Sequence, residues 1–371
     1  MKVLTILGTR PEIIRLSRVI PKLDQLCEKH ILVNTGQNYD PALNSNFFTE
    51  LGLRDPDYQL KAKGSFGQQI AAILPSLEAI LVREKPDRFL VLGDTNSSLA
   101  AIIAARLHIP VYHMEAGNRC FDPRSPEEVN RRIIDHTSDV LLPYTERSRQ
   151  NLLAEGIPGH RIFVTGNPIH EVILYYSKQI SQSDVLKRLG LEDGKYFLVT
   201  LHREENVDDA YRLDDFLEVL NYLQHDYSIP VIVSTHPRMR QQMPPKANPN
   251  ARSIIALGDN PEVHFLDPLG FFDFIALQKS AFCILTDSGT VQEESCLLGV
   301  PSVILRDTTE RPETLEAGAS VLSGADPAAI LRLVKQVTAD RASNWEAPAE
   351  YTRANVSDTV VRILMSHLGA R

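Results

Sequence analysis

Carboxylates follow two short apolar runs in the first half of the chain. Phe89–Leu92 leads to Asp94, and Val111–Met114 runs directly into Glu115. If both runs are parallel strands of one sheet, these acids lie at neighbouring strand tips and face one cleft. Two acids in one cleft are suited to general acid and base catalysis. Asp94 taken alone can instead cap a helix that begins near Ser97.

Glu127 is a third acid in the same half of the chain. It belongs to the opening Ser125-Pro126-Glu127-Glu128 of a predicted helix. The helix dipole favours negative charge in a first turn, and this reason alone would explain Glu127. The local pattern therefore does not separate a catalytic role from a structural one.

Two histidines follow strand-like runs in the second half. His202 comes after Phe197–Thr200, and His236 comes after Val231–Ser234. A single histidine is most often structural, whereas a pair at two strand ends is more typical of a site. His202 also opens a charged cluster that ends at Asn206.

The segment Asp287–Glu294 combines a strand end, a turn of small residues and a helix start. Backbone N–H groups at a helix N-terminus bind phosphate, so this segment is suited to a diphosphate. Glu293 or Glu294, one helical turn further on, could accept hydrogen bonds from a ribose hydroxyl. The alternative is that Ser288 is a simple N-cap.

Arginines stand near two other predicted strand ends. Arg10 lies in Gly8–Glu12, where the pattern predicts that Pro11 stands in the first turn of the next helix. An anion could bind there, although a solvated arginine in an ordinary turn would look the same. No G-x-G-x-x-G occurs nearby, so the dinucleotide fingerprint is absent. Arg306–Glu313 is a polar stretch after a further strand, and most of its charges could be plain surface.

Short β-branched runs alternate with longer helical patterns along the whole chain, and this βαβ spacing predicts two parallel sheets. The predicted strands of the first half are Val3–Leu7, Ile31–Asn34, Phe89–Leu92, Val111–Met114, Val140–Leu142 and Ile162–Thr165. Those of the second half are Tyr196–Thr200, Val231–Ser234, Val263–Phe265, Phe282–Leu285, Ser302–Leu305 and Ser320–Leu322.

The expected fold is therefore α/β, with two doubly wound parallel-sheet domains. We place them at residues 1–168 and 169–354, with Pro168–Lys195 as a helical connector. A final amphipathic helix over Asn355–Leu368 could lie against either domain, and we assign the tail from about 355 to 371 to the first.

Composition limits the class of protein further. The 371 residues carry a formal net charge of −8, which does not favour nucleic acid or an anionic membrane as a partner. Four widely spaced cysteines give no disulfide framework or cysteine zinc site, which fits a reducing cytoplasm. Met1–Leu7 is too short for a signal-peptide core, and no apolar run has the length of a membrane span.

Eight sequence blocks, in the right order, resemble the non-hydrolysing UDP-N-acetylglucosamine 2-epimerase family. The resemblance spans nearly the whole chain. The blocks are GTRPE at Gly8–Glu12, GDT at Gly93–Thr95, EAG at Glu115–Gly117, PEE-x-NR at Pro126–Arg131, TGN at Thr165–Asn167, HRE at His202–Glu204, TDSG-x-x-QEE at Thr286–Glu294 and RDTTERPE at Arg306–Glu313.

The resemblance implies Rossmann-like domains in a GT-B arrangement, a site in the interdomain cleft, UDP mainly on the second domain, and a homodimer. By position in the motifs, the catalytic candidates are Asp94, Glu115, Glu127 and His202, the last stabilising the departing UDP. Arg10, Ser288 and Gly289 match contacts near the phosphates, and Glu294 matches the ribose contact. The other substrate-binding candidates are Arg15, Arg131, His236, Thr290 and Arg311.

The family chemistry explains why such residues are needed. The C2 proton of an N-acetylhexosamine has no adjacent carbonyl that would stabilise a carbanion. Elimination of UDP from C1 with loss of that proton gives a 2-acetamidoglycal, and re-addition with protonation from the other face inverts C2. Two faces require at least two acid or base groups. The scheme requires no metal, nicotinamide or other cofactor.

The sugar and the mode of regulation stay open. UDP-GlcNAc and UDP-ManNAc are the default pair, but Met114–Asp122 resembles the branch that converts UDP-2-acetamido-2,6-dideoxy-L-talose to UDP-N-acetyl-L-fucosamine. The family often has Lys in place of Arg15 and Gly in place of Thr290. Asn34–Asp40 differs from the segment that binds an activating second UDP-GlcNAc in bacterial members. A GT-B glycosyltransferase, a hydrolysing epimerase and an inactive binding module are the competing functions.

Overall fold

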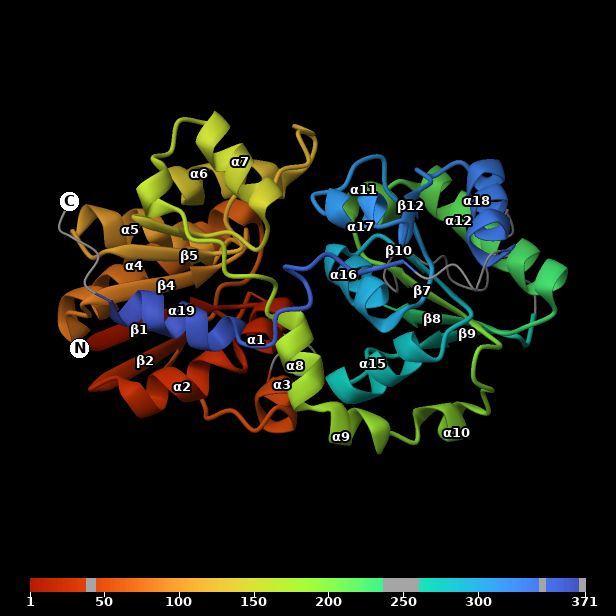
Figure 1. The fold of residues 1–371 in the computed structure, drawn as a ribbon, viewed down its shortest axis with the longest axis horizontal. Helices are drawn as coiled ribbons and strands as arrows, with labels where there is room; N and C mark the ends of the chain where they lie inside the picture. The colour runs from red at the N-terminus through yellow and green to blue at the C-terminus, as the bar shows by residue number, and fades with distance from the viewer. Residues whose placement is uncertain (38–44, 236–259, 340–344, 367–371) are drawn as a thin grey trace. The chain divides into compact units, whose positions relative to one another are not determined.

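The computed structural model describes residues 1–37, 45–235, 260–339 and 345–366. The chain forms two compact units. The N-terminal unit comprises Met1–Tyr175 and Ala349–Arg371, and the C-terminal unit comprises Tyr176–Pro348. Each unit is an α/β structure built around its own sheet (Figure 1).

The N-terminal unit contains a six-stranded parallel sheet with the order β3-β2-β1-β4-β5-β6. Its central strands are almost wholly buried, as expected for a parallel sheet covered on both faces. The strands are β1 (Lys2–Leu7), β2 (Lys29–Asn34), β3 (Tyr58–Gln59), β4 (Arg88–Leu92), β5 (Val111–Met114) and β6 (Val140–Leu142).

Helices cover both faces of this sheet, and Figure 1 shows α4, α5 and α6 on one face and α2 and α19 on the other. The helices are α1 (Arg10–Leu16), α2 (Val19–Leu26), α3 (Ser45–Glu50), α4 (Phe66–Glu84), α5 (Ala101–Arg106), α6 (Pro126–Thr137), α7 (Glu146–Ala154), α8 (Ile169–Tyr175) and α19 (Val356–Met365), with 3-10 turns at Ser98–Ala100 and Gly159–Arg161.

The C-terminal unit repeats the design with a second six-stranded parallel sheet, in the order β12-β11-β10-β7-β8-β9. When the strands of each unit are counted in chain order, the two sheets have the same strand order, read from opposite edges. The strands are β7 (Phe197–Leu201), β8 (Val231–Thr235), β9 (Val263–Leu266), β10 (Cys283–Thr286), β11 (Ser302–Ile304) and β12 (Ser320–Leu322).

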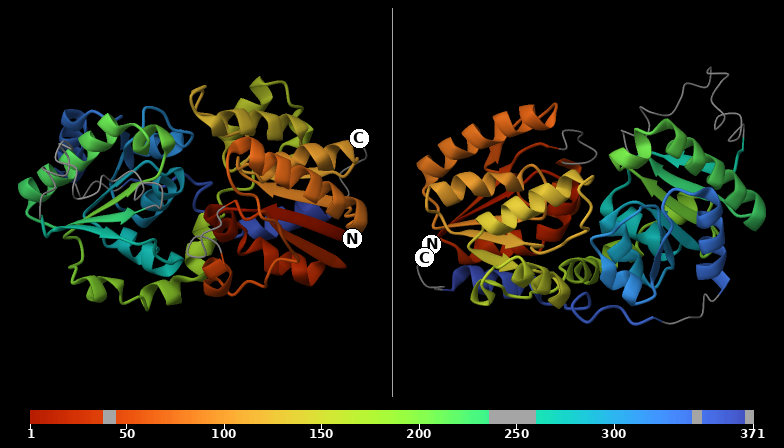
Figure 2. Two further views of the ribbon diagram at one scale, coloured as in Figure 1. Left: turned by 180° about the vertical axis from the view of Figure 1, so that it is seen from behind. Right: turned by 90° about the horizontal axis from the view of Figure 1, so that it is seen from above.

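Two apolar cores pack against this second sheet, on opposite faces because neighbouring strand residues point to opposite sides. Figure 2 shows helices on both sides of the sheet. One core packs strand residues such as Phe197 against α12 and α18, and the other packs Leu198 against α15 and α16. The helices are α9 (Ser177–Ser181), α10 (Val185–Leu189), α11 (Glu204–Val207), α12 (Ala210–Tyr227), α15 (Phe271–Lys279), α16 (Gly289–Leu298), α17 (Pro312–Glu316) and α18 (Pro327–Ala339).

The strand order reverses between β1 and β4 in the first sheet and between β7 and β10 in the second. In open α/β sheets, ligands bind at such switch points, beyond the carboxyl ends of the strands. The candidate residues after β4 and β10 therefore stand where this topology places a ligand.

The predicted class, two doubly wound parallel sheets, is confirmed, but one predicted strand is wrong. Ile162–Thr165 makes a single bridge, from Ile162 to Leu141, and is otherwise irregular. Thr165 donates to the carbonyl of Pro143 at 3.0 Å, and Pro143 has no N–H to continue the ladder. The short edge strand β3 was not predicted, because two residues carry too weak a pattern.

The connector and the C-terminal helix have clear structural causes. The segment predicted as helical connector forms α8, α9 and α10, and Gly190 ends α10 in the left-handed conformation that glycine tolerates best. Helix α19 packs on α2 in the N-terminal unit. The carboxylate of Glu171 accepts the backbone N–H of Ser357 at 2.7 Å and so satisfies the first turn of α19.

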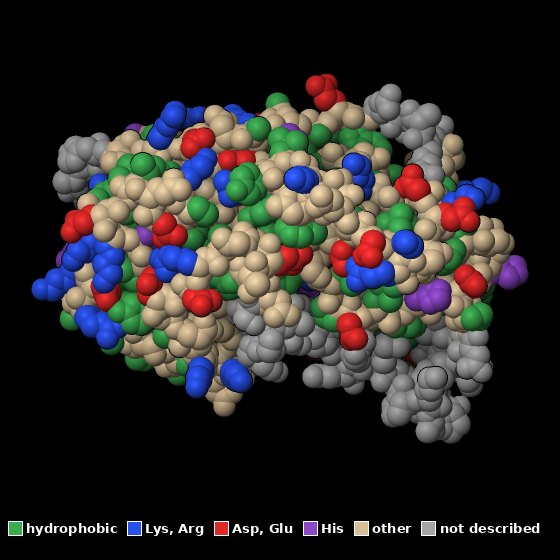
Figure 3. Space-filling model, turned by 90° about the horizontal axis from the view of Figure 1, so that it is seen from below, with side chains coloured by type: hydrophobic (Ala, Val, Ile, Leu, Met, Phe, Trp, Pro, Cys, Tyr) green, Lys and Arg blue, Asp and Glu red, His purple; other side chains and the backbone are tan. Residues whose placement is uncertain are grey.

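The surface features agree with an ordinary globular chain. On the face shown in Figure 3, acidic and basic side chains are intermixed. None of the helices in the described segments has the length and hydropathy of a membrane span. All four cysteines lie in described segments and are free thiols.

Candidate active site

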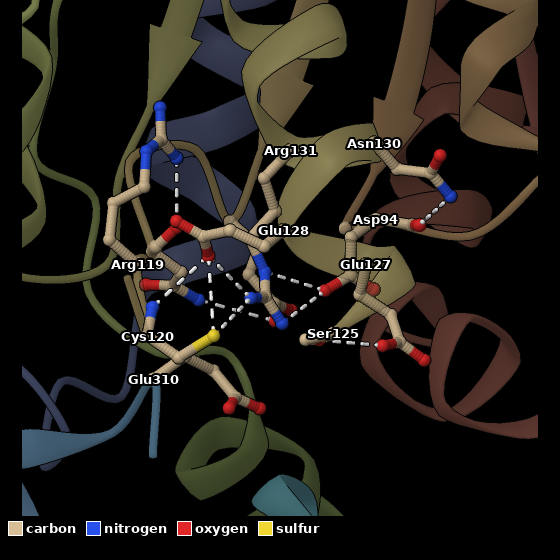
Figure 4. A network of polar contacts seen from close by, with 12 residues as sticks. Asp94, Arg119, Cys120, Ser125, Glu127, Glu128, Asn130, Arg131 and Glu310 are labelled. Atoms are coloured by element: carbon tan, nitrogen blue, oxygen red, sulfur yellow. Dashed lines mark hydrogen bonds and ion pairs between the residues drawn. The ribbon is translucent and has the colours of Figure 1, made fainter. Parts of the chain in front are cut away.

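Asp94 follows β4, and Arg131 of α6 holds its carboxylate. The Nε and Nη2 atoms of Arg131 both lie 2.8 Å from Asp94 Oδ2. Asn130 donates to the backbone carbonyl of Asp94 at 2.9 Å. Arg131 is buried, whereas the Asp94 side chain is 24% exposed, so the carboxylate keeps access to solvent. Figure 4 shows Arg131 between Asp94 and Glu128.

Glu115 follows β5, and a buried ion pair with Arg15 of α1 holds it. Tyr144 donates to Glu115 Oε2 at 3.1 Å, and Asn118 donates to Oε1 at 3.3 Å. A Cβ atom at Gly93 would lie 3.8 Å from Glu115 Oε2, so the carboxylate sits beside the residue that precedes Asp94. The structure thus brings the two predicted strand-tip acids into one neighbourhood.

The backbone at Glu115 has an unusual conformation. Its φ is +68°, in the left-handed region that side chains with a Cβ rarely adopt. Such a conformation costs roughly 1–3 kcal/mol and persists only where the surroundings hold it. Strain of this kind clusters at functional sites, which supports the choice of Glu115 as a site residue.

The third predicted acid, Glu127, differs from its neighbour Glu128. Glu127 is half-buried and accepts a hydrogen bond from the Ser125 hydroxyl at 2.9 Å. Glu128 is buried, lies 3.0 Å from Arg131 Nη1 and accepts the backbone N–H of Cys120 at 3.1 Å. Burial tends to raise the pKa of Glu128, but the Cys120 N–H and the Arg131 charge lower it below its usual value overall.

Glu12 of the GTRPE segment connects the loops after β1 and β4. Its Oε2 accepts the backbone N–H groups of Gly8 at 2.9 Å and Thr9 at 2.8 Å, and its Oε1 accepts the Thr95 hydroxyl at 2.9 Å. Burial raises the pKa of Glu12 to about 7, because these neutral donors only partly offset the lost hydration. Arg10, predicted to bind an anion, is half-buried with its guanidinium carbon 5.8 Å from the centre of the Phe47 ring.

In the C-terminal unit, His202 follows β7 and is held by Asp287, which follows the neighbouring strand β10. His202 Nδ1 lies 2.9 Å from Asp287 Oδ1. Asp287 is fully buried and also accepts the backbone N–H groups of His202 at 3.0 Å and Arg203 at 2.9 Å. The His202 side chain is 40% exposed, so the same contacts anchor the loop and present the ring to solvent.

The charge of this buried aspartate is stabilised. Burial alone would raise the pKa of Asp287, but the His202 ring and the backbone donors of His202 and Arg203 lower it well below its usual range. Asn206 donates to the same carboxylate at 3.2 Å. Asp287 is therefore an ionised anchor for the loop that carries His202.

The predicted phosphate cradle is the N-terminus of α16. Ser288 is the N-cap, but its hydroxyl lies 3.0 Å from the Thr290 hydroxyl and makes no capping bond to the helix. Among the described residues, no acceptor takes the N–H groups of Gly289, Thr290 or Val291. A side chain at Gly289 would put its Cβ 2.7 Å from Glu310 Oε1, so the Glu310 carboxylate would have to shift to make room for it.

The predicted ribose acceptor, Glu294, is buried one turn into α16. Gln278 of α15 donates to Glu294 Oε2 at 2.6 Å and fixes its orientation. The adjacent Glu293 pairs instead with Arg311, another predicted binding residue. His236 lies outside the described residues.

Several site residues were not predicted because they act through distant contacts. Tyr144 and Asn118 reach Glu115, Glu12 bridges two loops, and Asp287 and Gln278 hold His202 and Glu294. Glu12 and Asp287 stand inside the quoted motifs, which was the available signal. Among the described residues, no cluster of three or more His, Cys, Asp or Glu side chains is arranged to hold a metal ion.

The fold and these strand-tip residues define a doubly wound α/β protein of the nucleotide-binding type. A family model described as UDP-N-acetylglucosamine 2-epimerase matches residues 22–365. The chain therefore belongs to the UDP-N-acetylglucosamine 2-epimerase family.

Individual relatives agree with this assignment. The chain is 39% identical over 369 residues to UDP-N-acetylglucosamine 2-epimerase of Methanocaldococcus jannaschii, covering 98% of this chain and 99% of the relative. It is 40% identical over 333 residues to UDP-2,3-diacetamido-2,3-dideoxy-D-glucuronate 2-epimerase of Pseudomonas aeruginosa, covering 88% and 89%. The crystal structure of the M. jannaschii enzyme in complex with UDP-GlcNAc and UDP matches with a TM-score of 0.90 over 98% of this chain and 99% of that one.

Proposed function

We propose that the protein inverts C2 of a UDP-2-acetamido sugar, with UDP-GlcNAc and UDP-ManNAc as the default pair, without hydrolysing it. The observation that carries this proposal is the pair of strand-tip acids in a chain of this family. Asp94 and Glu115 follow neighbouring strands, and a buried arginine holds each of them. The ion pairs with these arginines hold both carboxylates in defined positions, as proton transfer requires.

The reaction proceeds by elimination and re-addition. A carboxylate takes the C2 proton while the bond from C1 to the diphosphate oxygen breaks, which gives a 2-acetamidoglycal and UDP. The diphosphate oxygen then adds back to C1, and a second acid delivers a proton to C2 on the opposite face. Asp94, Glu115 and Glu127 supply the acid and base groups in this scheme, which uses no metal or nicotinamide.

The C-terminal unit holds most of the leaving group in this proposal, and arginines of the N-terminal unit add to the binding. The N–H groups at the start of α16, which have no acceptor among the described residues, bind the diphosphate of UDP. His202 and Arg10 stabilise the charge that gathers on the departing diphosphate. Glu294, oriented by Gln278, accepts a hydrogen bond from the ribose. Arg15, Arg131, His236, Thr290 and Arg311 complete the set of binding residues.

The names of two relatives support the proposed reaction more strongly than they support a particular sugar. One acts on UDP-N-acetylglucosamine and the other on a UDP-2,3-diacetamido-2,3-dideoxy-D-glucuronate. Both names state inversion at C2 of a UDP sugar, while the substituents at other carbons differ. Reaction type is therefore the stronger part of the proposal, and the pair UDP-2-acetamido-2,6-dideoxy-L-talose and UDP-N-acetyl-L-fucosamine is the alternative substrate to assay.

The test is an assay of the purified protein in D₂O with each candidate UDP sugar and no acceptor. We expect deuterium at C2 of both epimers and a phosphorus NMR spectrum in which the UDP sugar pool is preserved. Free UDP accumulating with free sugar would indicate a hydrolysing epimerase. Turnover only in the presence of a sugar acceptor would indicate a glycosyltransferase.

We also propose a homodimer located in the cytoplasm, where its product supplies polysaccharide biosynthesis. The four free thiols fit a reducing compartment. Mass measurement by light scattering and fractionation of cells test the two statements separately.

A further inference from the structure

The fully buried carboxylate of Asp135, on α6, lies behind the strand tip that carries Glu115. Its Oδ1 is 2.8 Å from Nδ1 of His113, on β5. Its Oδ2 accepts the backbone N–H of Gly117 at 3.2 Å and lies 2.8 Å from Arg119 Nη1. The proposed mechanism uses none of these groups directly.

The second ring nitrogen of His113 also faces an acceptor. His113 Nε2 lies 3.0 Å from the carbonyl oxygen of Gly93. A carboxylate and a carbonyl can only accept, so both ring nitrogens must carry protons for both hydrogen bonds to form. On the other side of Asp135, Arg119 also contacts a second carboxylate, because its Nη2 lies 2.6 Å from Glu155 Oε2.

These contacts fix the backbone beside both catalytic candidates. His113 holds the carbonyl of Gly93, the residue immediately before Asp94. Asp135 holds the N–H of Gly117, two residues after Glu115. A single buried pair therefore acts on the loops after β4 and β5 at the same time.

The loop after β5 needs such support because the backbone conformation of Glu115 is unfavourable. Gly93, Glu115 and Gly117 have φ angles of +69°, +68° and +82°. Glycine adopts this region without penalty, but Glu115 has a Cβ and does not. The hydrogen bonds on either side of Glu115 oppose relaxation of its backbone toward an ordinary conformation.

We propose that His113 and Asp135 are a positioning pair for the epimerisation, which sets the backbone geometry of Asp94 and Glu115 relative to each other. This proposal rests on the proposed catalytic roles of those two acids. The pair touches neither substrate nor reacting atoms. Its loss should lower kcat through misplaced carboxylates and leave KM for the UDP sugar nearly unchanged.

The same unit contains a matched control. His30 on β2 has Nδ1 2.7 Å from Asp24 Oδ1 and Nε2 2.9 Å from the Thr5 hydroxyl. His30 is buried like His113, although its partner Asp24 is exposed, and His30 is the second residue of its strand, at the amino end of the sheet. It therefore reports the effect of changing a buried histidine that pairs with an aspartate, without moving a strand tip.

The experiment compares amide substitutions that each keep one nitrogen. An Asn side chain mimics the Nδ1 position and a Gln side chain mimics the Nε2 position. H113N keeps the donor to Asp135 but loses the bond to Gly93, and we expect kcat to fall by about 10²-fold. H113Q keeps a donor for the Gly93 carbonyl, and we expect a loss of no more than about tenfold. H30N and H30Q should keep kcat within about twofold while their thermal stability falls.

Distinct outcomes would overturn this inference or the proposed function. A folded H113N with wild-type kcat, or a loss in H30N equal to that in H113N, overturns the positioning role. So does a nitrogen-15 NMR spectrum of the wild-type protein at neutral pH in which the His113 ring has only one protonated nitrogen, a measurement that needs no variant to fold. If E115Q and D94N keep full turnover, the proposed function fails instead.

Discussion

The two candidate half-sites use different chemistry at equivalent places in the same topology. In the N-terminal unit, the loops after the switch-point strand β4 and its neighbour β5 carry acids held by buried arginines, Asp94 by Arg131 and Glu115 by Arg15. In the C-terminal unit, the loops after the switch-point strands β10 and β7 present backbone N–H groups at α16 and a half-exposed imidazole, His202. One arrangement is suited to moving protons and the other to holding an anion, which is the division that elimination of UDP requires.

A buried carboxylate anchors the loops in each unit, Glu12 in the first and Asp287 in the second. The pKa values of these two acids are shifted in opposite directions. Burial raises the pKa of Glu12 to about 7, since its donors are neutral. Burial acts on Asp287 in the same sense, yet the His202 ring and the backbone donors lower its pKa below the usual value. The comparison shows that a nearby charge, more than the number of hydrogen bonds, decides whether a buried acid stays ionised.

Removing the strand-tip acids should produce the largest effect and tests the first half of the comparison. We expect Glu115→Gln and Asp94→Asn each to lower kcat by roughly 10²–10⁴-fold, as for other positioned acid and base groups. UDP affinity, measured by calorimetry, should stay nearly intact, because in the proposed function the other unit holds most of the diphosphate.

The matched control for these variants is Glu84→Gln. Glu84 is a carboxylate of the same unit, 2.5 Å from Lys29, on a helix away from the strand tips. Its replacement should leave kcat unchanged. Equal losses of UDP affinity in Glu115→Gln and in replacements at α16 would show that the two half-sites do not divide the work as proposed.

The opposite pKa shifts of Glu12 and Asp287 should produce the next largest effect, which is on the pH dependence of stability. Glu12 has a pKa of 4.5 in the unfolded chain and about 7 in the folded protein, so folding favours its protonated form. Its stabilising contribution, about 3 kcal/mol, is fully present below pH 4.5 and is lost as the pH rises through about 7. Asp287 behaves in the reverse sense: its contribution is present above its unfolded pKa of 3.8 and is lost as the pH falls.

Denaturant unfolding of wild type and Glu12→Gln across this range measures the effect. Between about pH 5 and pH 8, the free energy of unfolding should fall much less in the variant than in the wild type, because glutamine does not titrate. A parallel pH dependence in both proteins would mean that Glu12 is ionised throughout and that its neutral donors stabilise the charge as well as water does.

The sequence alone located the strand tips but not the contacts that orient their side chains. Asp94, Glu115, His202 and Ser288 could be found because each follows a recognisable apolar run, and all four stand at strand tips in the structure. The roles of Glu12 and Asp287 could not be found in this way, since their partners are loops that follow other strands. Local sequence patterns indicate which strand or helix a residue follows, whereas contacts between distant segments decide which groups its side chain touches.

Neighbouring glutamates illustrate the same limit on a single helix. Glu127 and Glu128 are adjacent in α6, but a helix turns by about 100° per residue, so they face different surroundings. Glu128 meets Arg131 one turn later and is buried, while Glu127 meets Ser125 and is half-buried. No spacing rule assigned the inward direction to either of them before the fold was known.

The second half-site is tested by Glu294→Gln, for which we expect UDP to bind about tenfold more weakly through loss of a charge-assisted hydrogen bond. A UDP analogue without ribose hydroxyls provides the control, because it cannot make this bond in either protein. Its affinity should be the same for wild type and variant. A loss of equal size with the analogue would show that Glu294 does not contact the ribose and is instead a structural partner of Gln278.

Ser288→Ala should have the smallest effect and refines the description of the cradle. The Ser288 hydroxyl lies 3.0 Å from that of Thr290 and does not cap α16. If the backbone N–H groups of the first turn hold the diphosphate, removal of this hydroxyl should weaken UDP binding by no more than about threefold. A loss of a hundredfold or so would mean that the hydroxyl itself binds the phosphate, and the contrast between a side-chain half-site and a backbone half-site would no longer hold.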